Sequence, residues 1–165
     1  MASFQCHGQK NIRFYGSVNE QKFNGDIKKL PDVDITVYAL EEDNWKLVQE
    51  YKTDKRGKYE IELFFDVIYK ISYSKSGFVS KYVTIDCSNI PSIDQVSGFE
   101  MKTIMTIFKK ISDIDFSLLD EPLGKAQYNS QYNEMAWDID YTNDMKRKLD
   151  DILIRYYEKS DQNNY

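Results

Sequence analysis

The chain has 165 residues, which is enough for one domain of ordinary size and an appendage. It is 41% hydrophobic and 15% aromatic, a composition that excludes a disordered chain and favours a sheet-rich core. The formal net charge is -5 and no basic run is interleaved with aromatics, which argues against nucleic-acid binding. No stretch is long and apolar enough to span a bilayer, so we expect membrane association only through a partner.

Residues 1–10 resemble the end of a secretory signal peptide. Cys6 and Gly8 are small residues followed by Gln9, as at a cleavage site, but the charged start and apolar run of a complete signal are missing. The segment is therefore either a signal-peptide remnant or a disordered N-terminus. In the first case Cys87 is a lone buried thiol, whereas a Cys6–Cys87 disulfide is the alternative.

Short β-rich runs alternate with turn signals from residue 11 to residue 110. The expected strands are 12–18, 33–37, 45–52, 59–63, 69–73, 81–86 and 100–108. Several alternate apolar and polar residues, as strands with one buried face do. The turn 53–58, which contains Gly57, is expected to join the third and fourth strands in a hairpin. We therefore predict an antiparallel β-sandwich of about seven strands over residues 11–110.

Residues 111–165 form a C-terminal extension of different character. Residues 116–125 have no clean period and contain Pro122 and Gly124, so we expect an extended segment docked on the sandwich, with a short strand over 124–128. Helical spacing of apolar residues predicts one C-terminal α-helix over about 143–159, with Thr142 as its cap. The expected fold is mainly β, with this segment and helix added to it.

Residues for catalysis or metal binding are scarce. The single histidine, His7, lies in the N-terminal segment, so neither a Ser-His-Asp nor a Cys-His site can be assembled in the rest of the chain. Acidic residues occur without a calcium-loop motif, so solvated loops are weighed against calcium ligation. We expect no enzyme, no catalytic residue, no metal and no cofactor. The acidic residues considered are Glu60, Glu62, Asp113, Asp115, Asp120, Glu121, Asp138 and Asp140.

Four aromatic residues gather in the extension. If exposed, they would form a patch for a partner protein or a glycan, and if buried, they would pin the extension to the sandwich. The candidate residues are Tyr128, Tyr132, Trp137 and Tyr141.

Four motifs give the sandwich region a family resemblance. They are G-S-V at 16–18, P-D-V-D-I-T-V at 31–37, T-D-K-R-G-K-Y at 53–59 and K-S-G-F at 75–78, where Phe78 replaces the usual tyrosine. With these motifs, the chain resembles the carboxypeptidase-regulatory-like domain family, a transthyretin- or prealbumin-like β-sandwich found in Bacteroidetes envelope proteins.

The resemblance implies an exported structural or interaction module with no catalytic residues to carry over. We expect a periplasmic or outer-membrane-associated protein that binds another envelope protein through a sheet edge or the aromatic residues of the extension. Service as an accessory subunit of a secretion or gliding apparatus fits this context. The alternative is a carbohydrate-binding module that uses an aromatic patch around Trp137.

Overall fold

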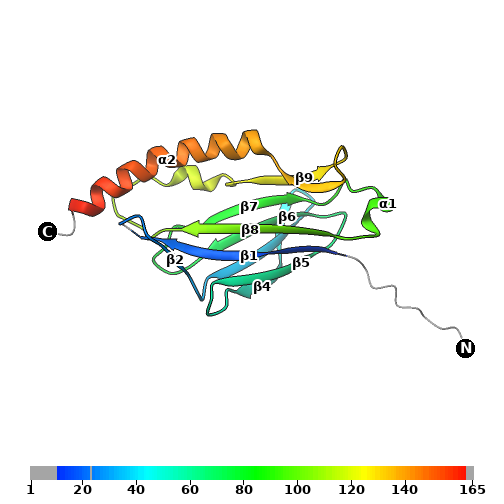
Figure 1. The fold of residues 1–165 in the computed structure, drawn as a ribbon, viewed down its shortest axis with the longest axis horizontal. Helices are drawn as coiled ribbons and strands as arrows, with labels where there is room; N and C mark the ends of the chain where they lie inside the picture. Colours follow the sequence, from blue (N-terminus) through cyan, green and yellow to red (C-terminus); the bar gives the residue numbers. More distant parts are fainter. Residues whose placement is uncertain (1–10, 23, 163–165) are drawn as a thin grey trace, which may run out of the picture.

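The computed structural model describes residues 11–22 and 24–162, which form two facing β-sheets with a long helix along one side (Figure 1). In sheet A, β1 (Ile12–Gln21) is central. On one edge β1 pairs antiparallel with β2 (Ile27–Lys29) and β5 (Lys58–Leu63), and on the other it pairs parallel with β8 (Phe99–Ile107). The order of sheet B is β10 (Glu134–Trp137), β9 (Lys125–Asn129), β7 (Lys81–Asp86), β6 (Ile68–Ser74), β3 (Asp34–Glu41) and β4 (Asn44–Lys52).

The predicted β-sandwich with one C-terminal helix is confirmed, with more strands than expected. Over the described residues the fold has ten strands: β2 and β10 add to the seven predicted in the sandwich, and β9 is the short strand predicted over 124–128. Two pairings, β1–β8 and β7–β9, are parallel, so the sandwich is mixed. Parallel neighbours need a crossover, and the connections contain α1 (Ser92–Gln95) and the short 3-10 helix η1 (Ser117–Asp120).

Alternating side chains of both sheets fill the main core. The strands β5, β6 and β7 each bury every second residue, as expected for strands with one covered face. A second cluster, made by Val79, Phe108, Leu119 and Tyr156, packs the helix α2 (Ile139–Gln162) against the sandwich. The fully buried side chains of the main core include Ile12, Phe14, Ile35, Ile61, Leu63, Ile71, Tyr73 and Ile85.

The predicted hairpin between the third and fourth strands is wrong. β4 lies in sheet B and β5 pairs with β1 in sheet A, so the turn 53–58 carries the chain from one sheet to the other. Thr53 holds this crossing: its hydroxyl donates to the Leu30 carbonyl at 2.9 Å and accepts from the Val33 N–H at 3.0 Å. Gly57 has φ +70 there, and its carbonyl accepts from the Val18 N–H at 2.7 Å. Turn chemistry is local, and it does not specify which sheet the next strand joins.

The glycine of the first motif permits a very close backbone contact in sheet A. A Cβ on Gly16 would lie 1.7 Å from the carbonyl oxygen of Thr103, which is far inside van der Waals contact. Gly16 pairs with Thr103 in the parallel register of β1 and β8. Any side chain at this position would push the two strands apart.

The C-terminal helix begins at Ile139 and not near residue 143, so the predicted cap is wrong. Asp138 occupies the cap, and its carboxylate accepts from the Tyr141 N–H at 2.9 Å. Thr142 lies in the first turn, where its hydroxyl donates to the Asp138 carbonyl at 2.6 Å. The strand β10 ends one residue before the cap, at Trp137. Among the described residues, no helix is long and apolar enough to cross a membrane.

The N-terminal predictions, including the one for Cys6, concern residues 1–10 and lie outside the described residues. Cys87 is a buried free thiol, and burial raises its pKa to about 12.

Thr53 provides a test of the crossing between the sheets. Thr53→Val keeps the side-chain shape but leaves the buried Val33 N–H without its acceptor, so we expect the free energy of unfolding to fall by about 1–3 kcal/mol. Thr36→Val on the outer face of β3 is the matched control and should change it by less than about 0.5 kcal/mol. Urea unfolding followed by circular dichroism measures both. Equal effects of the two variants would contradict a stabilising role for the Thr53 hydrogen bonds at this crossing.

Candidate functional site

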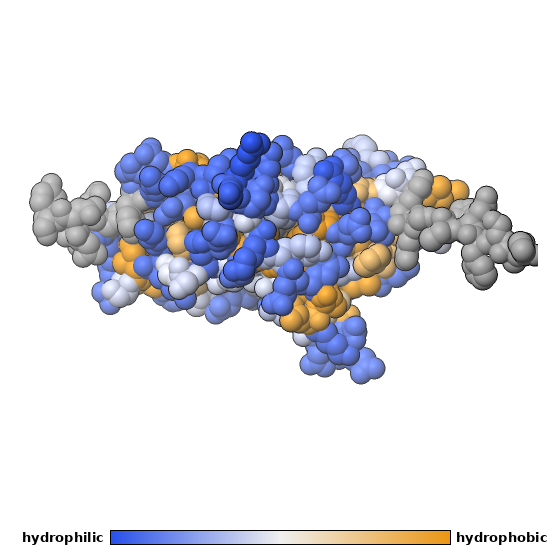
Figure 2. Space-filling view, turned by 90° about the horizontal axis from the view of Figure 1, so that it is seen from below, coloured by the Kyte–Doolittle hydropathy of each residue, from blue (hydrophilic) through white to orange (hydrophobic). Residues whose placement is uncertain are grey.

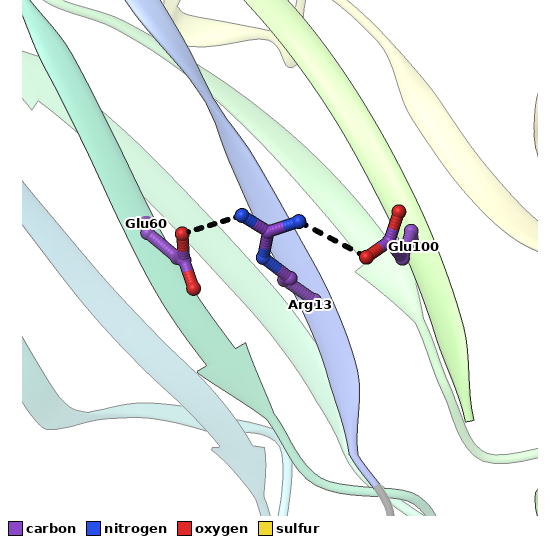
Figure 3. Close-up of polar contacts among 3 residues, drawn as sticks. All are labelled: Arg13, Glu60 and Glu100. Atoms are coloured by element: carbon purple, nitrogen blue, oxygen red, sulfur yellow. Dashed lines mark hydrogen bonds and ion pairs between the residues drawn. The ribbon is translucent and has the colours of Figure 1, made fainter.

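The acidic residues of β5 take part in a surface ion-pair network. Arg13, on β1, lies between Glu60 on β5 and Glu100 on β8, at 2.8 Å and 3.0 Å respectively (Figure 3). The hydrogen bond from Arg13 lowers the pKa of Glu60, which is the opposite of the raised pKa that a general acid needs at neutral pH. Because all three side chains are largely exposed, the network links strands with little gain in stability.

Two of the other acidic residues also have local structural partners. The carboxylate of Asp115 accepts from the Ser117 N–H at 2.8 Å, which lowers the pKa of Asp115, and Asp138 caps α2. In the described part of the chain, no group of three or more His, Cys, Asp and Glu residues could hold a metal ion.

A hollow of about 720 Å³ lies on the outer face of sheet A. Most of its charged groups already have partners: Arg13 bonds Glu60, Lys29 donates to the Ser17 hydroxyl at 3.2 Å, and the Asp54 carboxylate accepts two backbone N–H groups of its own turn. The hollow is therefore a weak candidate for a ligand site.

The four predicted aromatic residues lie on β9, the following turn, β10 and α2. The Tyr128 hydroxyl donates to the Asp94 carboxylate at 2.7 Å, which raises the pKa of Tyr128, and the Tyr141 hydroxyl donates to the Pro122 carbonyl at 2.7 Å. The first bond ties the extension to the sandwich, and the second joins α2 to an earlier segment of the extension.

The remaining two of these aromatic side chains differ in exposure. Two ring carbons of Trp137 lie 3.1 Å from the position that a Cβ on Gly124 would take, and the ring packs against the main core. Tyr132 is 65% exposed. The glycan alternative therefore stays a prediction, with Tyr132 as its most accessible ring.

The strand β4 forms a free edge of sheet B. It pairs with β3 along one side, and no other described strand pairs with it along the other. Four large apolar side chains on it are exposed, with exposed fractions of 40% for Trp45, 54% for Leu47, 44% for Val48 and 36% for Tyr51. Unpaired backbone groups flanked by apolar side chains are what an added strand binds.

An irregularity divides this edge into two halves. The register with β3 shifts between Val37 and Tyr38, which leaves Val48 without a partner residue. Trp45 and Leu47 lie opposite the partly buried Leu40 and Tyr38, whereas Tyr51 lies opposite the buried Ile35. The two halves of β4 therefore expose apolar side chains on opposite faces.

The charges on β4 do little to protect the edge. Lys46 forms an ion pair with Glu41, and Lys52 forms one with Asp34 at 3.0 Å, so β3 balances both cations. From the side of the molecule where β4 lies, the surface is mostly hydrophilic with several separate apolar patches (Figure 2). The sequence predicted the strand, but its position at an edge was missed. The available signal was the lack of clean alternation in residues 44–52.

No family model matches the chain, and no curated protein matches it in sequence. Solved structures similar to it include 3-chlorocatechol 1,2-dioxygenase from Rhodococcus opacus 1CP, with 13% identity over 64% of this chain and 62% of that one and a TM-score of 0.44. Catechol 1,2-dioxygenase from Acinetobacter sp. ADP1 has 10% identity over 74% and 60%, with a TM-score of 0.44. The shaft pilin SpaA from Lactobacillus rhamnosus GG has 12% identity over 62% and 52%, with a TM-score of 0.38.

The chain spans about three fifths of the length of these dioxygenases. Similarities at this level assign neither a family nor an activity.

The aromatic residues of the extension give a test that separates packing from recognition. Trp137→Ala should lower the free energy of unfolding by about 2–3 kcal/mol, since the ring is partly buried between Gly124 and the core. Tyr132→Ala, at an exposed position, should change it by less than about 0.5 kcal/mol. Thermal unfolding of both variants measures the difference. A Trp137→Ala protein as stable as the parent would contradict the packing role.

Proposed function

We propose that this chain is a non-catalytic protein-interaction module that recruits an extended segment of a partner protein by strand addition at the outer edge of β4. The observation that carries the proposal is a long strand whose outer edge has no described partner strand and which carries four exposed apolar side chains.

Strand addition uses the backbone of the edge for affinity and the flanking side chains for selectivity. β4 has 9 residues, which corresponds to about 30 Å of edge. An added strand would continue the order β9-β7-β6-β3-β4 and would cover apolar side chains on both faces of the sheet.

The side chains of β4 favour a partner segment with aromatic or branched apolar residues. Since Lys46 and Lys52 are already paired with acidic residues of β3, acidic residues on the partner add little. Trp45 and Leu47 offer contacts on one face, and Tyr51 offers them on the other.

The irregularity at Val48 favours a different protein over a second copy of this chain. A symmetric antiparallel pairing of two β4 strands over their whole length would centre the two-fold axis on Val48. The two irregularities would then face each other and interrupt the added ladder. A partner strand without a bulge avoids this conflict.

The cellular setting of the proposal comes from the motif resemblance. The carboxypeptidase-regulatory-like motifs at 16–18, 31–37, 53–59 and 75–78 support an exported module that is periplasmic or associated with the outer membrane. The partner is then another envelope protein, and service as an accessory subunit of a secretion or gliding apparatus fits this location.

The test starts with a photo-crosslinking amino acid at position 47 in the full chain. The expected result is a crosslink to one partner protein, identified by mass spectrometry, and none from a crosslinker at Ile93, which is 79% exposed on α1. With that partner purified, Val48→Lys should weaken binding at least tenfold, because it places a charge where the added strand lies. Ile93→Lys is the matched control and should bind normally.

Hydrogen exchange supplies an independent readout of the same binding event. The amides of 44–52 should exchange more slowly in the complex, because strand addition gives the outward N–H groups acceptors. A partner that binds the Val48→Lys variant normally and slows hydrogen exchange only at amides outside 44–52 would contradict the proposal. So would a homodimer joined through β4 in the absence of any partner.

A further inference from the structure

The helix α2 and the strand β8 enclose a groove on the side of the molecule away from β4 (Figure 1). Its volume is about 650 Å³, within the range of small-molecule sites. Leu149 and Leu153 of α2 form one wall, residues 102–106 of β8 form the other, and Val83, Leu123 and Trp137 also line it. Most of the lining is apolar.

All the charged residues that line the groove are positive. They are Lys81 of β7, Lys102 of β8 and Lys146 of α2, and none of the described residues that line it is Asp or Glu. The whole chain has a net charge of -5, so this local excess of cations runs against the overall balance. An apolar groove with three ammonium groups complements a molecule that is both anionic and apolar.

Lys81 is the unusual member of this set. It is only 4% exposed, and it lies on the inner face of β7 with Val83 and Ile85. Its ammonium group donates to the Thr106 carbonyl at 2.7 Å and lies 4.3 Å from the centre of the Phe108 ring. No acidic side chain among the described residues forms an ion pair with it, and burial lowers its pKa to about 7.

A buried ammonium group without a counter-ion is costly, and an apolar residue of similar length would remove that cost. One of its three N–H groups has a described acceptor, so the others can bond a ligand. An anion bound in the groove would supply the counter-ion that Lys81 lacks.

We propose that the groove between α2 and β8 binds an amphipathic organic carboxylate, with its carboxylate on Lys81 and its apolar chain or ring between α2 and β8. This site is separate from β4, so the proposal of ligand binding does not depend on the proposal of strand addition. The apolar walls contribute nothing to binding inorganic phosphate, which therefore should not bind.

Dodecanoate is the probe, and dodecan-1-ol is its uncharged match. Calorimetry with the full chain should give saturable binding of dodecanoate, weaker binding of the alcohol and none of inorganic phosphate. Lys81→Met keeps the length of the side chain and removes its charge, so dodecanoate affinity should fall at least tenfold while affinity for the alcohol is unchanged. Lys110→Met, at an exposed position outside the groove, removes the same charge and should leave both affinities unchanged.

The binding should depend on pH with a defined sign. Below pH 7 Lys81 is protonated in the free protein, and above it each binding event must take up a proton, so dodecanoate affinity should fall as the pH rises past 7. The charged groups that face this region from other elements are Lys102 of β8 and Lys146 of α2. The pH dependence should disappear in Lys81→Met.

A second variant guards against a failure of Lys81→Met to fold. Ile104 is 60% exposed at the rim, so Ile104→Glu should leave stability nearly unchanged and weaken dodecanoate binding through like-charge repulsion. Equal binding of dodecanoate and dodecan-1-ol, or unaltered dodecanoate affinity in the folded variants, would overturn the proposal. So would an absence of saturable dodecanoate binding.

Discussion

The close passage of β1 and β8 at Gly16 is the constraint on which the rest of the fold depends. It allows β1 to pair in parallel with β8 over nine positions while β5 and β2 pair with its other edge. Parallel pairing of β8 with β1 needs a crossover, and the chain enters β8 from β7 of sheet B through α1. The return from β8 then delivers the extension to the side of the sandwich where β7 lies.

This route explains how the extension completes the sandwich. β9 adds to β7 in parallel, β10 follows in a hairpin, and α2 then runs back along β8. Phe108 at the end of β8 packs against Phe116 and Tyr156, with ring centroids 5.5 Å and 5.0 Å apart, and so anchors the helix at its C-terminal half. Towards its N-terminal half the helix stands off from β8, and the groove lies there.

Local signals in the sequence predicted much of this fold. Alternation located β3, β5 and β6, because each has one buried face, and turn residues such as Gly57 marked real changes of direction. The sequence did not show that β5 leaves the sheet of β4, since the pairing partner of a strand is a long-range property. The helix start was misplaced because Asp138 and Thr142 are both good capping residues, and β10 fixes which one is used.

The site residues were harder to predict for a different reason. Lys81 shares the inner face of β7 with Val83 and Ile85, because every second residue of a strand points to the same side. A lysine at a strand end is nevertheless ordinarily solvated. Burial of its ammonium group depends on Thr106 and Phe108, which are more than twenty residues away in the chain. Exposed apolar residues in β4 likewise become informative only when β4 is known to be an edge.

The two proposed sites follow from how the fold treats its sheet edges. A sandwich is open along its sides, and unpaired strands there attract other chains unless they are covered or made polar. On the side of β8, α2 covers the edge, and Lys81 donates a hydrogen bond to the Thr106 carbonyl of this strand. On the side of β4, the protection is limited to a bulge, the exposed Glu50 and two lysines that β3 already neutralises. An incompletely covered edge suits the proposed amphipathic ligand, whereas an uncovered one suits the proposed partner strand. The two proposed sites therefore lie on opposite sides of the same molecule.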